Sequence, residues 1–350
     1  MEYIAFDSHK QYTWVEREEA SSGRRKGVRL EHRPGAIRSY LAGCAPGTAV
    51  AVEATGNWYW IVGEIEEAGL RPLLVHPRKA KLMMGMINKT DQLDAQGLNR
   101  LQRNGTLPVV WIPGGELRDL REITRTRLVL TRQRTRLKNR ITATLSKYGV
   151  AESSRSDAYA VGARSELEQR LSALPEQARW ASRLLLEQLN LVAVQIEQME
   201  KRLRELVRIT PAMQALETLP GIGVILAATI ALEIGDVNRF PSAEHLASYA
   251  GTTPRVQASG GHVRYGRTRP DVNRYLKWAF AEAGNAVAVN HPRYPLRHVS
   301  QLYTRLRQRK GHAKAVGAVA RHLAEAAFHV LRGPQSYRDP AAKAGGAREV

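Results

Sequence analysis

Cysteine, long apolar runs and acidic residues are all scarce in this sequence. Its one cysteine, Cys44, excludes an internal disulfide and a metal site built from four cysteines. The longest apolar run, residues 224–232, is far shorter than the ~18 residues of a membrane span. The opening MEYIAFDSHK also lacks the extended apolar stretch of a signal peptide. We therefore expect a cytoplasmic protein that does not enter a membrane.

The scarcity of acids leaves a strongly basic chain. Its 33 acidic residues face 53 lysines and arginines, which gives a net charge of +20 and a pI near 10.4. Such an excess indicates a polyanionic partner, because each basic contact to a phosphate releases condensed counterions. Ribosomal proteins, membrane-surface proteins and nucleic-acid enzymes share this balance, so charge alone defines only the class of partner. The length of 350 residues allows about two domains.

The first third of the chain has the pattern of an α/β domain. Short β-type runs alternate with helical patterns, which is typical of a sheet with parallel members. The expected strands are residues 3–6, 12–15, 28–30, 48–52 and 72–75, and the expected helices are residues 58–68 and 90–103.

The middle of the chain has the pattern of two long helices. Residues 118–140 hold nine lysines and arginines against two acids, with apolar residues at helical spacing. In residues 164–206 acids and bases balance, and apolar residues recur in steps of four and three, as in a heptad repeat. The heptad positions are Leu185, Leu189, Val192, Ile196, Met199, Leu203 and Leu206. This repeat fits equally a helical hairpin within one chain and a coiled-coil dimer.

Two further segments complete the expected organisation. Residues 210–333 have mostly helical patterns, and residues 334–350 have the composition of a disordered tail. We therefore predict an α/β domain at 1–112, a helical or coiled-coil segment at 113–209, and a third domain at 210–333 before the tail.

Four carboxylates have positions that favour a metal site. Asp7 and Glu53 end two of the expected strands, while Asp91 and Asp94 lie three residues apart on one face of a helix. Clustered carboxylates repel one another and are tolerated mainly around divalent cations, and oxygen ligands suit Mg²⁺ or Mn²⁺. Two such ions can assist phosphoryl transfer. Taken singly, each residue could instead be a turn residue, a helix cap or an ordinary surface acid.

The segment LPGIG at residues 219–223 indicates a helix-hairpin-helix. Gly221 and Gly223 allow a tight turn, and the backbone N–H groups of the next helix can hold a DNA phosphate. Such a contact positions DNA without reading its sequence. The alternative is a buried helix that follows an ordinary Pro-Gly turn.

Ser259 precedes two glycines in a segment rich in arginine. A hydroxyl exposed on a flexible loop among guanidinium groups suits attack on a phosphodiester, because arginine stabilises the developing charge. On these residues alone, an ordinary flexible loop explains the segment as well. His262 is a possible base, but its sequence position does not place it beside Ser259.

These motifs together resemble the DEDD transposases of insertion sequences, the group related to the pilin-gene invertase Piv. The carboxylates lie within AFDSHK, VAVEATGNWYW and NKTDQLDAQGLNRL. The stretch from LPGIGVILAATIALEIGD through FPSAEHLASYAGTTPRVQASGGHVRYGRT to DVNRYLKWAF looks like the second domain of that family. The resemblance runs from residue 3 to about residue 332, in the family's order of parts.

The resemblance implies a fold, a chemistry and partners. Residues 1–112 would form a RuvC-like, RNase H-like domain whose four carboxylates bind Mg²⁺ or Mn²⁺. The middle helices would mediate oligomerisation, as a dimer or tetramer, and nucleic-acid contacts. Ser259 matches the family's nucleophile, which forms a covalent link to DNA; many members have two serines before the glycine pair, and here the first is Ala258. The family also implies a noncoding bridge RNA, encoded by the element, that pairs with donor and target DNA.

The expected activity is therefore recombination of DNA near the nucleoid. Two other hypotheses remain: a RuvC-like metal nuclease or junction resolvase in which Ser259 has no chemical role, and a DNA-binding protein without activity. The residues expected to contact nucleic acid are Gly221, Gly223, Arg255, Arg264, Arg267, Arg269, Arg274, Lys277, Arg125, Arg132 and Arg136.

Overall fold

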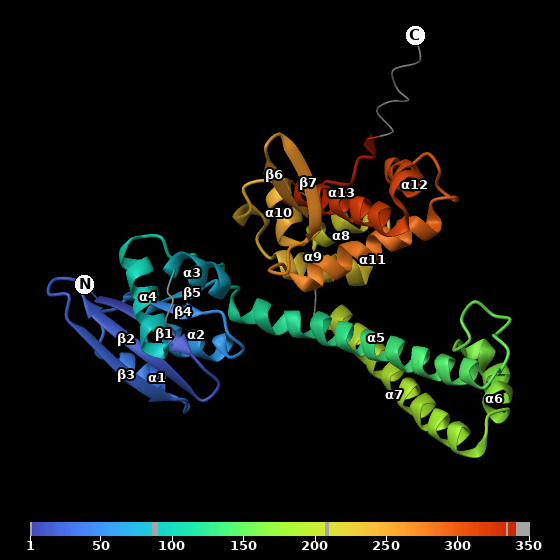
Figure 1. Cartoon of the computed structure of the whole chain (residues 1–350), viewed down its shortest axis with the longest axis horizontal. Helices are drawn as coiled ribbons and strands as arrows, with labels where there is room; N and C mark the ends of the chain where they lie inside the picture. Colours follow the sequence, from blue (N-terminus) through green and yellow to red (C-terminus); the bar gives the residue numbers. More distant parts are fainter. Residues whose placement is uncertain (1, 86–89, 207–209, 334, 341–350) are drawn as a thin grey trace, which may run out of the picture. The chain divides into compact units, whose positions relative to one another are not determined.

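The computed structural model describes residues 2–85, 90–206, 210–333 and 335–340 (Figure 1). The chain divides into two compact units, Met1–Pro113 and Gly114–Val350. Within the described ranges, no helix is both long enough and apolar enough to traverse a membrane.

The first unit is built on a five-stranded mixed sheet in the order β3-β2-β1-β4-β5. β1 pairs antiparallel with β2 and parallel with β4, β3 pairs antiparallel with β2, and β5 pairs parallel with β4. This α/β architecture is consistent with a RuvC-like domain, and all five strands expected from the sequence are present. Their bounds are β1 Glu2–Ser8, β2 Tyr12–Glu19, β3 Arg25–Glu31, β4 Ala49–Glu53 and β5 Arg71–Val75.

Helices pack on both faces of this sheet. Helices α1 (Ala36–Leu41) and α2 (Trp58–Glu67) contribute to one apolar cluster, together with alternate residues of β1 and β4. Helices α3 (Pro77–Met84) and α4 (Asp91–Arg103) contribute to a second cluster with the intervening strand residues. The helices α2 and α4 confirm the two expected from the sequence, whereas α1 and α3 were not predicted.

The second unit begins with a helical hairpin. Helix α5 (Gly115–Lys147) packs against α7 (Glu176–Leu206), and η1 (Val161–Ala163) and α6 (Arg164–Ser172) lie between them in sequence. The face of α7 that carries Leu189, Val192 and Ile196 is the face buried against α5. The middle of the expected heptad stripe therefore packs within one chain, whereas Leu206 at its end is exposed.

The remaining helices of this unit form one large apolar core, in which α8, α9, α10, α11, α12 and α13 all take part. The bounds are α8 Pro211–Glu217, α9 Val224–Ile234, η2 Val237–Arg239, α10 Ala243–Tyr249, α11 Arg274–Asn290, α12 His298–Lys310 and α13 His312–Arg332. Residues 335–340, in the segment expected to be disordered, contact this core: the Tyr337 backbone N–H donates to Thr218 Oγ1 at 2.7 Å. Residues 334 and 341–350 of that tail lie outside the described residues.

A buried ion pair joins α5 to α9. Glu233 of α9 is fully buried, and its carboxylate accepts two hydrogen bonds from the Arg125 guanidinium, at 2.7 and 3.1 Å. Asn273 Nδ2 donates to the same carboxylate at 2.7 Å. The buried Arg121 donates to the backbone carbonyls of Leu232 and Glu233, at 2.8 and 2.9 Å. A buried charge must be paired in this way to be tolerated, so these contacts fix the position of α5 on α9.

The serine segment is a β-hairpin, and its assignment to a flexible loop was wrong. β6 (Pro254–Ser259) pairs antiparallel with β7 (His262–Thr268). The connection is Gly260–Gly261, with φ of 55° and 77°. Positive φ at both central residues is what a two-residue hairpin turn of type I′ requires, and two glycines supply it without strain. The glycine pair therefore forms the turn of a hairpin and is not part of a flexible loop.

Candidate carboxylate site and serine hairpin

The alternation of strand residues directs Asp7 toward α4. On β1, Ile4 and Phe6 join the apolar cluster under α1 and α2, and Ala5 joins the cluster under α3 and α4. Successive strand side chains point to opposite faces of a sheet, so Asp7 shares the face of Ala5. Its side chain is only 9% exposed.

The same alternation places Glu53 on that face. On β4, Ala51 packs under α4, and Glu53 follows two residues later at the end of the strand. The parallel register pairs Phe6 with Val52, so Asp7 and Glu53 end neighbouring strands at one edge of the sheet. The structure thus brings both strand carboxylates to the side of the sheet that α4 covers.

Helix α4 supplies Asp91 and Asp94 in its first turn. The N-cap is Thr90, whose Oγ1 accepts a hydrogen bond from the Leu93 backbone N–H at 3.2 Å. Because Thr90 caps the helix, the Asp91 carboxylate is not needed as the cap. Asp91 Oδ2 instead accepts a hydrogen bond from the Tyr12 hydroxyl at 2.7 Å.

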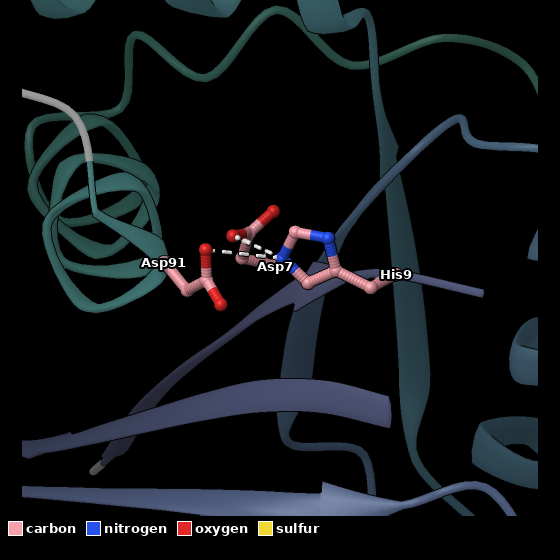
Figure 2. Close-up of side chains that lie close together, drawn as sticks. All are labelled: Asp7, His9 and Asp91. Atoms are coloured by element: carbon pink, nitrogen blue, oxygen red, sulfur yellow. Dashed lines mark hydrogen bonds and ion pairs between the residues drawn. The ribbon is translucent and has the colours of Figure 1, made fainter. Parts of the chain in front are cut away.

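His9 lies between two of these carboxylates (Figure 2). Its Nε2 atom is 3.2 Å from Asp7 Oδ2 and 3.2 Å from Asp91 Oδ1. One ligand atom from each of Asp7, His9 and Asp91 lies within 4.8 Å of the others, a separation that one metal ion could bridge. The closest set among the described residues is therefore two carboxylates and an imidazole, rather than the four carboxylates expected.

The electrostatics of Asp7 are those of a crowded acidic site. Burial raises the pKa of the Asp7 carboxyl above its ordinary value; His9 opposes this effect, and the charges of Asp94 and Asp91 add to it. A carboxylate held ionised here at neutral pH is costly without a cation beside it. These donors therefore fit a divalent ion with hard ligands, such as Mg²⁺ or Mn²⁺.

Ser259 stands at the tip of the β6–β7 hairpin. It is the last residue of β6 and pairs directly across the ladder with His262, the first residue of β7. Directly opposite residues share a face of a ladder, so Ser259, His262 and Arg264 lie on one side of the hairpin with Gln257. All four are exposed. The structure thus places His262 beside Ser259, which the sequence alone did not establish.

The opposite face of the hairpin is apolar and equally exposed. Val256 pairs with Tyr265, and Ala258 pairs with Val263. Val256, Val263 and Tyr265 are exposed large hydrophobic residues. The hairpin therefore projects from the helical core with neither face covered by the described part of its own chain.

The predicted nucleic-acid contacts fall into two groups. The exposed residues without an acidic partner named here are Arg132, Arg136, Gly221, Gly223, Arg255, Arg264, Arg267, Arg274 and Lys277. Two arginines have acidic partners within the chain: Arg269 pairs with Asp271 at 2.6 Å, and Arg125 pairs with the buried Glu233. The Arg125 guanidinium is thus engaged in the link between α5 and α9.

The turn at residues 219–223 joins α8 to α9 and keeps its glycines at the surface. Gly221 has φ of 79°, and a Cβ atom there would stand 2.4 Å from the Ala283 carbonyl oxygen of α11. Glycine is therefore required at this position by both backbone angle and space. Gly223 is the N-cap of α9, so the first N–H groups of that helix begin at an exposed residue.

Sequence reasoning missed two kinds of residue. His9 is absent from the expected site residues, although a histidine two residues after a strand-end aspartate is a recognisable ligand type. Glu233 was missed because it lies in an apolar helix, where a single carboxylate signals a buried partner. Its partner Arg125 is 108 residues away in sequence, and no local pattern links the two.

Comparison with known families matches both units. A model for DEDD transposases of the IS110 type, described as a transposase, matches residues 28–150. A model described as the transposase IS116/IS110/IS902 family matches residues 213–300. Together the two regions cover more than half of the chain. Glu53, Asp91 and Asp94 lie in the first region and Ser259 in the second, whereas Asp7 precedes both.

Individual relatives extend the similarity over most of the chain. A probable family 20 transposase of Pseudomonas aeruginosa is 26% identical over 69% of this chain and 72% of its own length. The transposase for the insertion sequence element IS1111A of Coxiella burnetii is 24% identical over 86% of this chain and 81% of its own. A pilin gene-inverting protein of Moraxella bovis is 26% identical, over 80% of this chain and 79% of its own.

The fold, the carboxylate cluster and these matches define the chain as a transposase, an enzyme that cuts and rejoins DNA. Its partner is therefore DNA, which accounts for the net charge of +20. The chain belongs to the IS110/IS116 family of insertion-sequence transposases, whose members are related to the pilin gene-inverting proteins.

Proposed function

We propose that this transposase exchanges DNA strands by transesterification, with Ser259 as the nucleophile. The observation that carries the proposal is the position of Ser259, which is exposed at the tip of a hairpin that leaves the helical core. A hydroxyl in this place can reach a phosphate without displacing any packed group. Arg264, on the same face of the hairpin, and Arg255, farther along β6, are exposed as well, and guanidinium groups stabilise the charge that develops on a phosphoryl oxygen.

The proposed step conserves the phosphodiester bond energy. A bond forms between Ser259 Oγ and phosphorus, and the bond from phosphorus to one deoxyribose oxygen breaks. The released deoxyribose oxygen takes up a proton, while the serine proton passes to a base. Attack by a hydroxyl of a different DNA strand on the phosphoserine then reverses the process, joins that strand and restores the serine, so no nucleotide cofactor is consumed.

Asp7, Glu53, Asp91 and Asp94 are proposed to hold Mg²⁺ or Mn²⁺. A divalent ion bound there would supply Lewis-acid stabilisation of a phosphate oxygen. The protein would preorganise the site by holding Asp7 and Asp91 close together in the absence of the ion. The buried Asp7 and the hydrogen bond from Tyr12 to Asp91 support this role, since both restrict where the carboxylates can move.

Nucleic-acid binding is proposed for two surfaces of the second unit. The exposed glycine turn before α9 offers backbone N–H groups to a DNA phosphate, as in a helix-hairpin-helix. Arg132 and Arg136 on α5 are exposed and available to a structured RNA encoded by the element. A bridge RNA of this kind would select donor and target DNA by base pairing, and the protein would then bind the nucleic-acid backbones without reading their sequence.

An assembly of two or more copies is proposed through α7. Trp180, Leu184, Leu191 and Val194 are exposed, between 46% and 64%. At 100° per residue they fall within about 80° of one another, opposite the face that packs on α5. A long helix with an apolar stripe on each of two opposite sides is typical of a helix that packs against two partners.

Light scattering tests this assembly. The double variant Leu184→Glu, Leu191→Glu should have a lower measured mass than the wild type, and a monomeric wild type would overturn the proposal.

A covalent-adduct assay tests the main proposal. Purified protein, element-derived RNA, Mg²⁺ and end-labelled DNA carrying the element junction are mixed and then denatured. We expect a protein–DNA adduct in the wild type and in the control Ser336→Ala, and none in Ser259→Ala. Loss of the adduct in Asp7→Ala as well would tie the carboxylates to the same step.

The alternative is a RuvC-like metal nuclease or junction resolvase. The pairing of Asp7 and Asp91 around His9 favours it independently, since that cluster lies wholly within the first unit. Cleavage that leaves no adduct, and that persists in Ser259→Ala, would establish the nuclease and remove the chemical role of Ser259.

A further inference from the structure

His9 is placed as a metal ligand in its own right. We propose that its imidazole Nε2 coordinates the divalent ion held by Asp7 and Asp91, and that this nitrogen ligand shifts the site toward Mn²⁺ over Mg²⁺. The inference rests on the metal role proposed above for the carboxylates. It adds a ligand that is outside the four carboxylates and comes from the β1–β2 turn.

The separations between the donor atoms fit one coordination sphere. His9 Nε2 stands 3.2 Å from Asp7 Oδ2 and 3.2 Å from Asp91 Oδ1. Two ligand atoms that each lie about 2.1 Å from a metal at a right angle are about 3.0 Å apart. Small movements of these side chains would therefore admit an ion between them. Figure 2 shows the imidazole edge and both carboxylates turned toward a common point.

The surroundings of His9 hold its ring in this orientation. The ring stacks on Tyr12, with centroids 4.7 Å apart, and the Tyr12 hydroxyl donates to Asp91. The backbone of His9 is fixed at both ends: its N–H donates to the Tyr12 carbonyl at 2.9 Å, and its carbonyl accepts from Asn57 Nδ2 at 2.8 Å. The Arg29 guanidinium covers the Tyr12 ring at 3.9 Å. Partners that orient a ligand in this way are a common feature of metal sites.

The competing explanation gives His9 a purely electrostatic role. An imidazolium between Asp7 and Asp91 would offset their repulsion without touching a metal. The two roles differ once an ion is bound, because a counterion histidine would be displaced whereas a ligand histidine would stay. They also differ in metal preference: Mg²⁺ is bound mainly by oxygen, while Mn²⁺ accepts imidazole more readily.

Pulsed electron paramagnetic resonance on the Mn²⁺-loaded full-length protein separates the two roles. A directly coordinated imidazole nitrogen modulates the Mn²⁺ spin echo, and this signal does not depend on DNA cleavage. We expect a nitrogen coupling in the wild type and in the control His245→Gln, and none in His9→Gln. Replacing all histidine with the ¹⁵N form in the unmutated protein should change the coupling, so the test does not require a variant to fold.

Competition titrations supply the second measurement. His9→Gln should lose about tenfold in its preference for Mn²⁺ over Mg²⁺, in line with the loss of one ligand. If Mn²⁺ binds the wild type without nitrogen coupling, the ligand role of His9 is overturned while the carboxylate site stands. If Mn²⁺ binds the wild type no better than it binds Asp7→Asn, the metal site proposed above fails, and the role of His9 fails with it.

Discussion

Replacing Glu233 with glutamine tests the link between the helical hairpin and the C-terminal core. The substitution keeps the shape of the side chain and removes its charge. It removes the buried anion that the Arg125 guanidinium, which is 20% exposed, reaches at 2.7 Å and that Arg121 approaches at 3.9 Å. One glutamine –NH₂ group must also face donors on Arg125 or Asn273, where a carboxylate oxygen accepted a hydrogen bond before.

The expected loss in the free energy of unfolding is about 3 kcal/mol. Breaking a buried ion pair by removing one partner costs roughly 3–5 kcal/mol. Two features put Glu233→Gln at the lower end of this range. Arg125 can regain some water through its exposed part, and the Glu122 carboxylate stays 3.5 Å from its guanidinium.

Chemical denaturation followed by circular dichroism measures this loss. A double-mutant cycle with Arg125→Met isolates the pairwise term, which we expect to be about 1–3 kcal/mol. A cost below about 1 kcal/mol for Glu233→Gln, or no coupling between the two positions, would refute the claim that this ion pair fixes α5 on α9.

Three further predictions concern the proposed metal site and the nucleic-acid surfaces. Burial raises the pKa of Asp7, so its contribution to stability is fully present below the ordinary value of 3.8 and is lost as pH rises through the folded-state pKa. Asp7→Asn should therefore melt higher than the wild type at neutral pH in a chelator and gain nothing from Mn²⁺; a lower melting temperature would contradict this account. Gly221→Ala should cost about 1–3 kcal/mol, from its φ of 79° and the backbone oxygen 2.4 Å from the new Cβ, whereas the control Gly223→Ala has open space and should cost far less in the same melts. Arg132→Ala and Arg136→Ala should each reduce the salt-dependence slope of nucleic-acid affinity by about one, with unchanged slopes showing that α5 makes no phosphate contact there.

Much of the carboxylate site could be predicted from the sequence, because strand and helix periods determine direction. The sequence places Asp7 and Glu53 at the ends of two strands, and a spacing of three places Asp91 beside Asp94; the shared face of Asp7 and Glu53 follows only from the register of β1 with β4. The role of His9 could not be predicted in this way. It depends on the turn between β1 and β2, where no periodicity applies and where the stacking on Tyr12 sets the ring.

The second unit shows a different limit of sequence reasoning. The hairpin that holds Ser259 was missed because a glycine pair fits both a mobile loop and a tight turn, and only pairing with β7 distinguishes the two. Arg125 was expected to contact nucleic acid because a strongly basic helix is typical of a surface that binds phosphates. Its pairing with Glu233 is set by the packing of α5 on α9, which local sequence does not encode.

The exposure of the β6–β7 hairpin separates the proposed chemistry of Ser259 from the folding of the core. Ser259 is exposed at the tip of the hairpin, so under the role proposed for it a mutation there would remove the chemistry and leave the helical core, the basic surfaces and the apolar stripe of α7 intact. An inactive copy would still occupy the same nucleic acid and still enter assemblies with active copies. Damage to the serine codon in one copy of the element would therefore create an inhibitor of its siblings, and decayed copies would restrain the spread of intact ones.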